Sequence, residues 1–282
     1  MPLPLRRSMC SIALKIQVRP GGERRTMRGL VGEELLTAWE CSRALPEMEA
    51  ALALLELACP ERPAEEWARL PLSERNALLL ELRAETLGRR MEGFAVCPEC
   101  GAQLEFAVDA RELARRLRAR PADASTEANE EPFGFQMRPV NTLDLLAAAA
   151  AENEEEARAI LLARTAGTEN AAMSSAEIPE AGSSAAHWLE VQPESVAALL
   201  TERFERINAE AEIRVHLECA GCGGRPLLDL DMVRFLLREI RAAAGRLLEE
   251  IHALAGAYGW SEAAIAAMSG GRRAAYLEML GV

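Results

Sequence analysis

Apolar residues recur at intervals of three and four along much of this chain, the spacing of one buried face of an α-helix. Proline or glycine follows several of these stretches, as at Pro46, Pro60 and Gly88, and predicts that the helices end there. The longest stretch, residues 231–258, is uninterrupted and predicts one long C-terminal helix. Helices are predicted at residues 33–45, 47–59, 71–88, 110–118, 143–151, 154–164, 193–207, 231–258, 261–268 and 272–280.

A second, shorter pattern alternates apolar and polar residues, which is typical of half-buried β-strands. It predicts a strand at residues 11–18, turned by Pro20 and the glycines that follow, and another at 133–140. Four more short strands form two pairs, each pair enclosing a tight turn. These pairs are residues 93–96 with 104–108, and 213–217 with 227–230. The fold class is therefore α+β, mostly helical.

The two tight turns carry the most informative residues of the chain. Each reads Cys-x-x-Cys-Gly, and together they supply the four thiols of Cys97, Cys100, Cys219 and Cys222. Four thiolates close the tetrahedral shell that structural zinc prefers, and the glycine permits the positive φ that such a knuckle needs. We therefore predict a four-cysteine zinc ribbon that binds one structural zinc ion.

Two other interpretations of the cysteines stay open. A redox-active pair requires only one such motif at a strand-to-helix junction, and neither turn here leads directly into a helix. Four buried structural thiols are the second alternative. The odd total of seven cysteines is unlike a secreted disulfide framework and favours a reducing cytosol.

The flanks of the two turns resemble each other. A shift of 122 positions places Cys97 on Cys219, and it also places Asp109 on Asp231, each at the start of a predicted helix. Both halves thus follow the order helix, strand, knuckle, strand, helix, which indicates an internal duplication. Chance similarity between two ribbon hairpins is the alternative.

Composition divides the chain into four segments. Residues 1–60 hold a β-hairpin and helices, and residues 61–118 hold the first helix and knuckle half. Residues 119–192 hold an acidic linker, a strand-helix insert and a segment from 167 to 186 that is poor in large apolar residues, which predicts flexibility. Residues 193–282 hold the second half with the long helix and the short helices after it.

Charge limits the classes of partner. The net charge of −12 argues against wholesale binding to a phosphate backbone, whose affinity comes from lysine and arginine. The first ten residues lack the apolar core of a signal peptide, and no run of 18 apolar residues predicts a membrane span. We expect a cytoplasmic protein without membrane contact.

Catalytic patterns are missing from the sequence. The three histidines have no nucleophile arranged beside them, no phosphate-binding glycine loop occurs, and four cysteines leave no open position on a zinc ion. We therefore expect no enzymatic activity and no small-molecule substrate.

The C-terminal segment combines residue types that dominate protein interfaces, namely tyrosine, tryptophan and arginine. A docking surface for another protein is one interpretation, and burial of the aromatic residues against the end of the long helix is the other. The candidate docking residues are His252, Tyr258, Trp260, Arg272, Arg273 and Tyr276.

Several of these stretches together resemble a family of zinc-ribbon proteins encoded with contractile phage tails and phage-tail-like injection systems. The chain is similar to the baseplate hub assembly proteins of T-even-type phages. The resemblance implies a structural or assembly role among other baseplate or tail proteins, with no known reaction. It rests on residues 70–80, 97–106, 219–222, 251–255 and 258–262, on the arginines 272 and 273, and on residues 276–277.

Two functions of different classes therefore remain. The first is a zinc-stapled structural or chaperone-like component of a baseplate, either free in the cytosol or built into a particle. The second is a zinc-ribbon nucleic-acid-binding or transcription-associated module. Ribbons that bind nucleic acid place basic and aromatic residues on the hairpins, whereas Glu99, Glu105, Glu218 and Asp229 occupy these hairpins. Electrostatics thus favours the first function.

Overall fold

We describe the protein from a computed structural model in which residues 27–118, 135–168 and 194–281 can be described. The chain forms two compact units. The first contains residues 68–75 and 117–212, and the second contains residues 27–67, 76–116 and 213–282. The four sequence segments proposed above stay a prediction. The predicted strand at 11–18, the acidic linker predicted at 121–132, and residues 169–186 of the segment predicted to be flexible lie outside the described residues.

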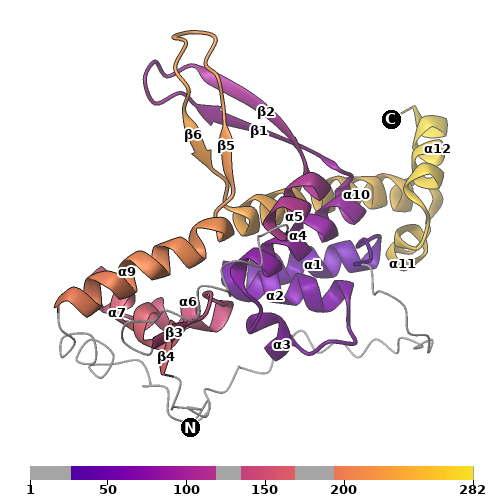
Figure 1. The fold of residues 1–282 in the computed structure, drawn as a ribbon. Coiled ribbons are helices and arrows are strands. Elements are labelled where there is room, and N and C mark those ends of the chain that lie inside the picture. Colours follow the sequence, from indigo (N-terminus) through magenta and orange to yellow (C-terminus); the bar gives the residue numbers. More distant parts are fainter. Residues whose placement is uncertain (1–26, 119–134, 169–193, 282) are drawn as a thin grey trace. The chain divides into compact units, whose positions relative to one another are not determined.

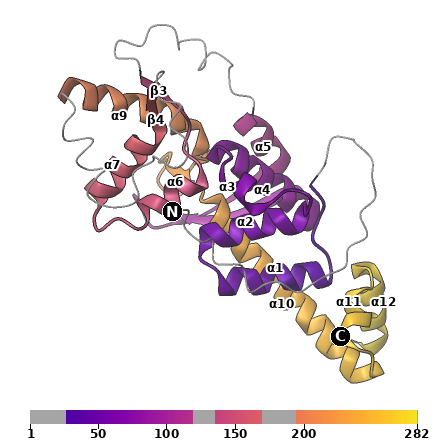
Figure 2. The same ribbon diagram turned by 90° about the horizontal axis from the view of Figure 1, so that it is seen from below.

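The second unit is built around the long helix α10 (Met232–Tyr258). Helix α1 (Glu33–Ala44) packs against both α10 and α2 (Glu47–Ala58), as Figure 2 shows. Two short helices, α11 (Glu262–Ala266) and α12 (Gly270–Leu280), fold back onto the end of α10. Their shared core buries Leu36 of α1, Leu247 and Leu254 of α10 and Ile265 of α11.

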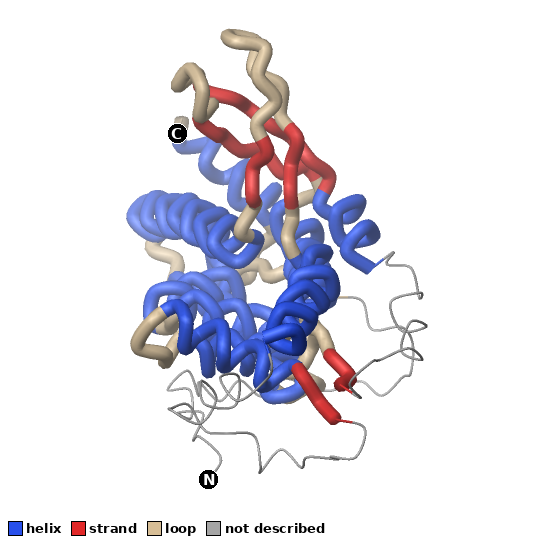
Figure 3. Tube along the Cα trace, turned by 60° about the vertical axis from the view of Figure 1, so that its left-hand side comes forward, coloured by secondary structure: helices blue, strands red, loops and turns tan. Residues whose placement is uncertain are grey.

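Two β-hairpins stand out from the helices of this unit (Figures 1 and 3). Strand β1 (Arg90–Val96) pairs with β2 (Gln103–Asp109), and β5 (Arg214–His216) pairs with β6 (Leu227–Asp229), both antiparallel. The first hairpin lies between α4 (Leu72–Leu87) and α5 (Ala110–Arg118) in the chain. The second lies between α9 (Glu194–Asn208) and α10. The predicted order of elements is thus present in both halves, while common ancestry stays a prediction.

The first unit is smaller and has a buried polar centre. It contains β3 (Phe135–Met137), α6 (Thr142–Ala148), α7 (Glu154–Thr165), β4 (Ala166–Thr168), α9 and the 3-10 turn Ala209–Ala211. The fully buried Asp144 carboxylate accepts hydrogen bonds from Arg138 and Arg164 at 2.6–2.9 Å and from the backbone N–H of Asn141 at 3.1 Å. A charge removed from water is tolerated because it is paired and fully hydrogen-bonded.

Aspartate and serine caps position the helices as the sequence predicts. The side chains of Asp109 and Asp231 each accept a hydrogen bond from the backbone N–H three residues later, at 3.0 Å. Ser261 caps α11 in the same manner, and Asn141 forms a reciprocal capping box with Asp144. These bonds satisfy N–H groups that a helix start leaves without partners.

Three local expectations are wrong, and one helix was not expected. The strand expected over residues 133–140 is only β3 in the described part, because Pro139 cannot donate a ladder hydrogen bond. Gly167 and Thr168, expected in the flexible segment, pair with β3 as part of β4. The last helix, expected to begin at residue 272, instead begins at Gly270, because Ser269 caps it. The unexpected helix is α3 (Ala64–Ala68), which buries Trp67.

Candidate metal centre

The two Cys-x-x-Cys turns have the same backbone geometry. In the first, the N–H of Gly101 donates to the carbonyl of Cys97 at 2.9 Å; in the second, the N–H of Gly223 donates to the carbonyl of Cys219 at 2.8 Å. Both glycines have positive φ, 74° and 73°, which a residue with a Cβ rarely adopts. Each turn therefore directs its two cysteines to one side, as the sequence predicts for a knuckle.

The four sulfur atoms converge between the hairpin tips. All of them lie within 4.8 Å of one another. Sγ of Cys97 is 3.7 Å from Sγ of Cys222, and Sγ of Cys100 is 3.6 Å from Sγ of Cys219. A zinc ion with four Zn–S bonds of about 2.3 Å needs sulfurs about 3.8 Å apart. The arrangement therefore fits a tetrahedral metal ion of this size.

The same crowding perturbs the thiols. Backbone N–H groups of Cys222 and Gly221 point at the Cys219 sulfur and lower the pKa of this thiol to about 7. The Gly224 N–H lowers the pKa of Cys222, but the neighbouring sulfurs of Cys100 and Cys219, with partial desolvation beside them, outweigh it and raise this pKa to about 12. Neighbouring thiols thus oppose one another's ionisation, and a cation held between them would favour the thiolate form of all four.

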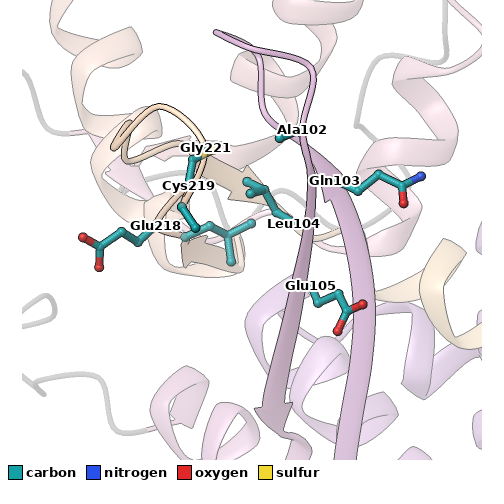
Figure 4. Close-up of a pocket in the computed structure, with 9 residues that line it drawn as sticks. Ala102, Gln103, Leu104, Glu105, Glu218, Cys219 and Gly221 are labelled. Atoms are coloured by element: carbon teal, nitrogen blue, oxygen red, sulfur yellow. The ribbon is translucent and has the colours of Figure 1, made fainter.

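A small apolar cluster supports the sulfurs. Cys97, Cys219 and Leu104 are buried together, with Ala95, Ala102 and Leu217 packed around them. Figure 4 shows Leu104 directed toward the segment that holds Cys219, whereas Gln103 and Glu105 point away from it. A hollow of about 220 Å³ remains between β2 and residues 217–221. Cys100 and Cys222 are exposed, so one side of the cluster faces solvent.

Glu99 extends from the first knuckle to the second. Its carboxylate lies 3.5 Å from Sγ of Cys222, and a Cβ on Gly224 would come within 2.5 Å of the same carboxylate. The sequence places Glu99 on the hairpin, but this contact was not expected from it. The glycine after the second knuckle was a signal, because a glycine permits such a close approach.

A buried arginine fixes the base of the first hairpin. The side chain of Arg83, 4% exposed, donates to both carboxylate oxygens of Glu239 in α10, at 2.6 and 2.9 Å. It also donates to the carbonyls of Gly88 and Arg90, at 2.5 and 2.7 Å. Sequence patterns did not indicate this residue, because no spacing relates Arg83 to Glu239, which is 156 positions away.

Some of the candidate docking residues in the C-terminal segment contact other residues of the same unit. Tyr258, Trp260 and Tyr276 form one aromatic cluster, with ring centroids 4.5–5.7 Å apart. Arg273, whose side chain is 11% exposed, pairs with Glu250 at 2.6 Å and donates to the carbonyl of Met268. His252 and Arg272 are exposed, and the Arg272 guanidinium lies 5.9 Å from the Tyr276 ring centroid. The structure brings the aromatic residues together and leaves His252 apart from them in exposed helix.

Among residues 27–118, 135–168 and 194–281, no helix is long and apolar enough to cross a membrane.

Comparison with protein families matches residues 20–231 of the 282-residue chain to one family, described as T4 bacteriophage base plate protein. The match spans both pairs of cysteines and ends at the start of α10. Comparison with curated proteins and with solved structures finds no match. The resemblance inferred from the sequence is thereby confirmed for the family.

Proposed function

The chain belongs to the T4 bacteriophage base plate protein family, and we propose that it is a non-enzymatic structural or assembly component of a contractile-tail baseplate. The observation that carries the proposal is the family match, which spans about three quarters of the chain. A baseplate component must hold a fixed shape while it contacts several subunits. The two projecting hairpins, joined at their tips, suit this requirement.

We assign the joint to zinc held by Cys97, Cys100, Cys219 and Cys222. The distances between the sulfurs and the matched knuckle turns support the assignment. The ion supplies a cross-link between residues more than a hundred positions apart, and all four ligand positions belong to cysteine. A two-stranded hairpin is marginally stable alone, so a metal cross-link between two such hairpins stabilises both.

The C-terminal segment is the proposed contact with another baseplate or tail protein. Tyr258 and Met279 are exposed large apolar residues there, and the exposed Arg272 lies 5.9 Å from the ring centroid of Tyr276. Trp260 and Tyr276 hold Tyr258 through ring contacts, and the ion pair of Arg273 with Glu250 joins α12 to α10. Arginine and tyrosine over a rigid support are typical of interface hot spots.

The nucleic-acid alternative is less well supported. Ion pairs within the hairpins neutralise several of their arginines: Arg90 with Glu92, Arg214 with Asp229, and Arg89 with Asp109. A phosphate-binding ribbon needs free cations on its hairpins.

Particle composition tests the proposal. The chain should be found by quantitative mass spectrometry in purified tails, as a structural subunit, or in isolated assembly intermediates only, as an assembly factor. Deletion of its gene should stop baseplate assembly in either case. Normal, infectious tails from the deletion strain, with the chain in neither fraction of the wild type, would contradict the proposal.

A further inference from the structure

The first hairpin presents an unusual outward face to solvent. Phe94 is 74% exposed and Val96 is 67% exposed, and they lie two positions apart on the same face of β1. The opposite face of the hairpin carries the buried residues Met91, Leu104 and Phe106. The outward face is therefore a second apolar surface, apart from the core of the hairpin.

A close contact on the buried face of the hairpin determines which side chains of β1 point outward. A Cβ on Gly93 would lie 2.4 Å from Cζ of Phe106, so the Phe106 ring lies directly over this glycine. A slip of β1 by one residue would turn Phe94 inward, but it would also place a side chain where this ring lies. The contact between Gly93 and the Phe106 ring thus keeps the Phe94 side chain on the outward face.

The neighbours of Phe94 are acidic and polar. Glu105 lies directly opposite it in the sheet register, and Gln103 lies opposite Val96. Glu105 has no ion-pair partner among the described residues, and its side chain points away from the second knuckle (Figure 4). Directly opposed side chains have Cβ atoms about 5 Å apart. An aromatic face beside a free carboxylate is a favourable site for a guanidinium group, which stacks on the ring and pairs with the carboxylate.

The backbone beside this face is also available. Within the described residues, β1 pairs with β2 alone, so its other edge has no strand partner. Residues 93–96 carry no charge, although charges commonly protect edge strands from pairing. An extended segment can add to such an edge through main-chain hydrogen bonds, while its side chains decide specificity.

We propose that the outward face of β1 and β2 binds an extended segment of another tail protein, with an arginine of that segment on the Phe94 ring and paired with Glu105. This inference rests on the proposed baseplate function. A second copy of this chain fits poorly, because the arginine on its own outward face, Arg90, is already paired with Glu92, and its Glu105 would face the same carboxylate.

A peptide titration of the isolated full-length protein tests the inference. The probe is a capped hexapeptide in which arginine alternates with valine, compared with the same peptide carrying glutamate in place of arginine. Amide NMR shifts should change at residues 92–96 and 103–107 with the arginine peptide only. Phe94→Leu and Glu105→Gln should each weaken binding about two- to five-fold, since each removes one of the two arginine contacts.

Leu227→Ala is the matched control, because Leu227 is an exposed apolar residue of the second hairpin and should not affect binding. Equal binding of the two peptides, or unchanged affinity in Glu105→Gln, would overturn the inference. So would a dimer of the free protein that Phe94→Leu dissociates, since the face would then bind a second copy. None of these results depends on particle composition, so the proposed function is tested separately.

Discussion

Replacing Arg83 by methionine should destabilise the second unit and release the base of the first hairpin. The substitution keeps most of the apolar stem but removes every donor that holds Glu239 and the carbonyls of Gly88 and Arg90. Because removal of one partner leaves a largely buried carboxylate unpaired, breaking such a pair costs about 3–5 kcal/mol. For a unit of about 150 residues, each kcal/mol lowers Tm by about 2–4 °C, so we expect a decrease of about 10 °C.

The Arg83→Met, Glu239→Leu double variant provides the control. It removes the carboxylate together with the guanidinium, so it should recover part of the loss, and the coupling between the two substitutions should exceed about 1 kcal/mol. Native-state hydrogen exchange should locate the loss of protection at β1 and in the first third of α10, around Glu239. A loss below about 1 kcal/mol in Arg83→Met, or strictly additive variants, would show that the arginine does not hold the hairpin base.

Five further substitutions test the packing of the two units and the proposed C-terminal contact. Gly93→Ala should lower the free energy of unfolding, measured in urea, by about 1–3 kcal/mol, because the added Cβ meets the Phe106 ring. Gly245→Ala is the control: it has open space around it in α10 and should raise this free energy by up to about 1 kcal/mol. Asp144→Asn should lower the free energy of unfolding of the first unit by about 3 kcal/mol, because two arginines lose their common carboxylate. Unchanged hydrogen exchange in α6 and α7 would contradict this. Trp260→Ala should lower Tm by loss of packing, whereas Arg272→Ala should leave Tm unchanged but reduce incorporation into tails. A lower Tm in Trp260→Ala together with normal incorporation of Arg272→Ala would show that the C-terminal segment acts only as core.

Local signals predicted most of the fold and the cluster of four cysteines. The 3.6-residue periodicity locates α1, α2, α4 and α10 within one or two residues, because each of these helices buries one face against a neighbour. The knuckles were predictable because a Cys-x-x-Cys-Gly turn contains all of its own geometric requirements. The convergence of the four sulfurs followed from the chemistry of zinc and from the two turns alone.

Contacts between residues far apart in the chain could not be predicted from the sequence. The ion pair of Arg83 with Glu239 and the buried position of Asp144 between two arginines depend on how helices pack, and no periodicity encodes them. The start of α12 was also misassigned, because two adjacent glycines suggest a break. The capping hydrogen bond that the Ser269 hydroxyl accepts from the backbone N–H of Arg272 outweighs their low helix propensity.

Native mass spectrometry of the protein purified without added metal tests most directly whether one zinc ion joins the two knuckles. The wild type should carry one zinc ion per chain, because four converging cysteines close a tetrahedral shell. The Cys97→Ser, Cys219→Ser variant, which removes the two buried thiols, should carry none. A metal-free wild type, or a variant that retains its zinc, would contradict the account.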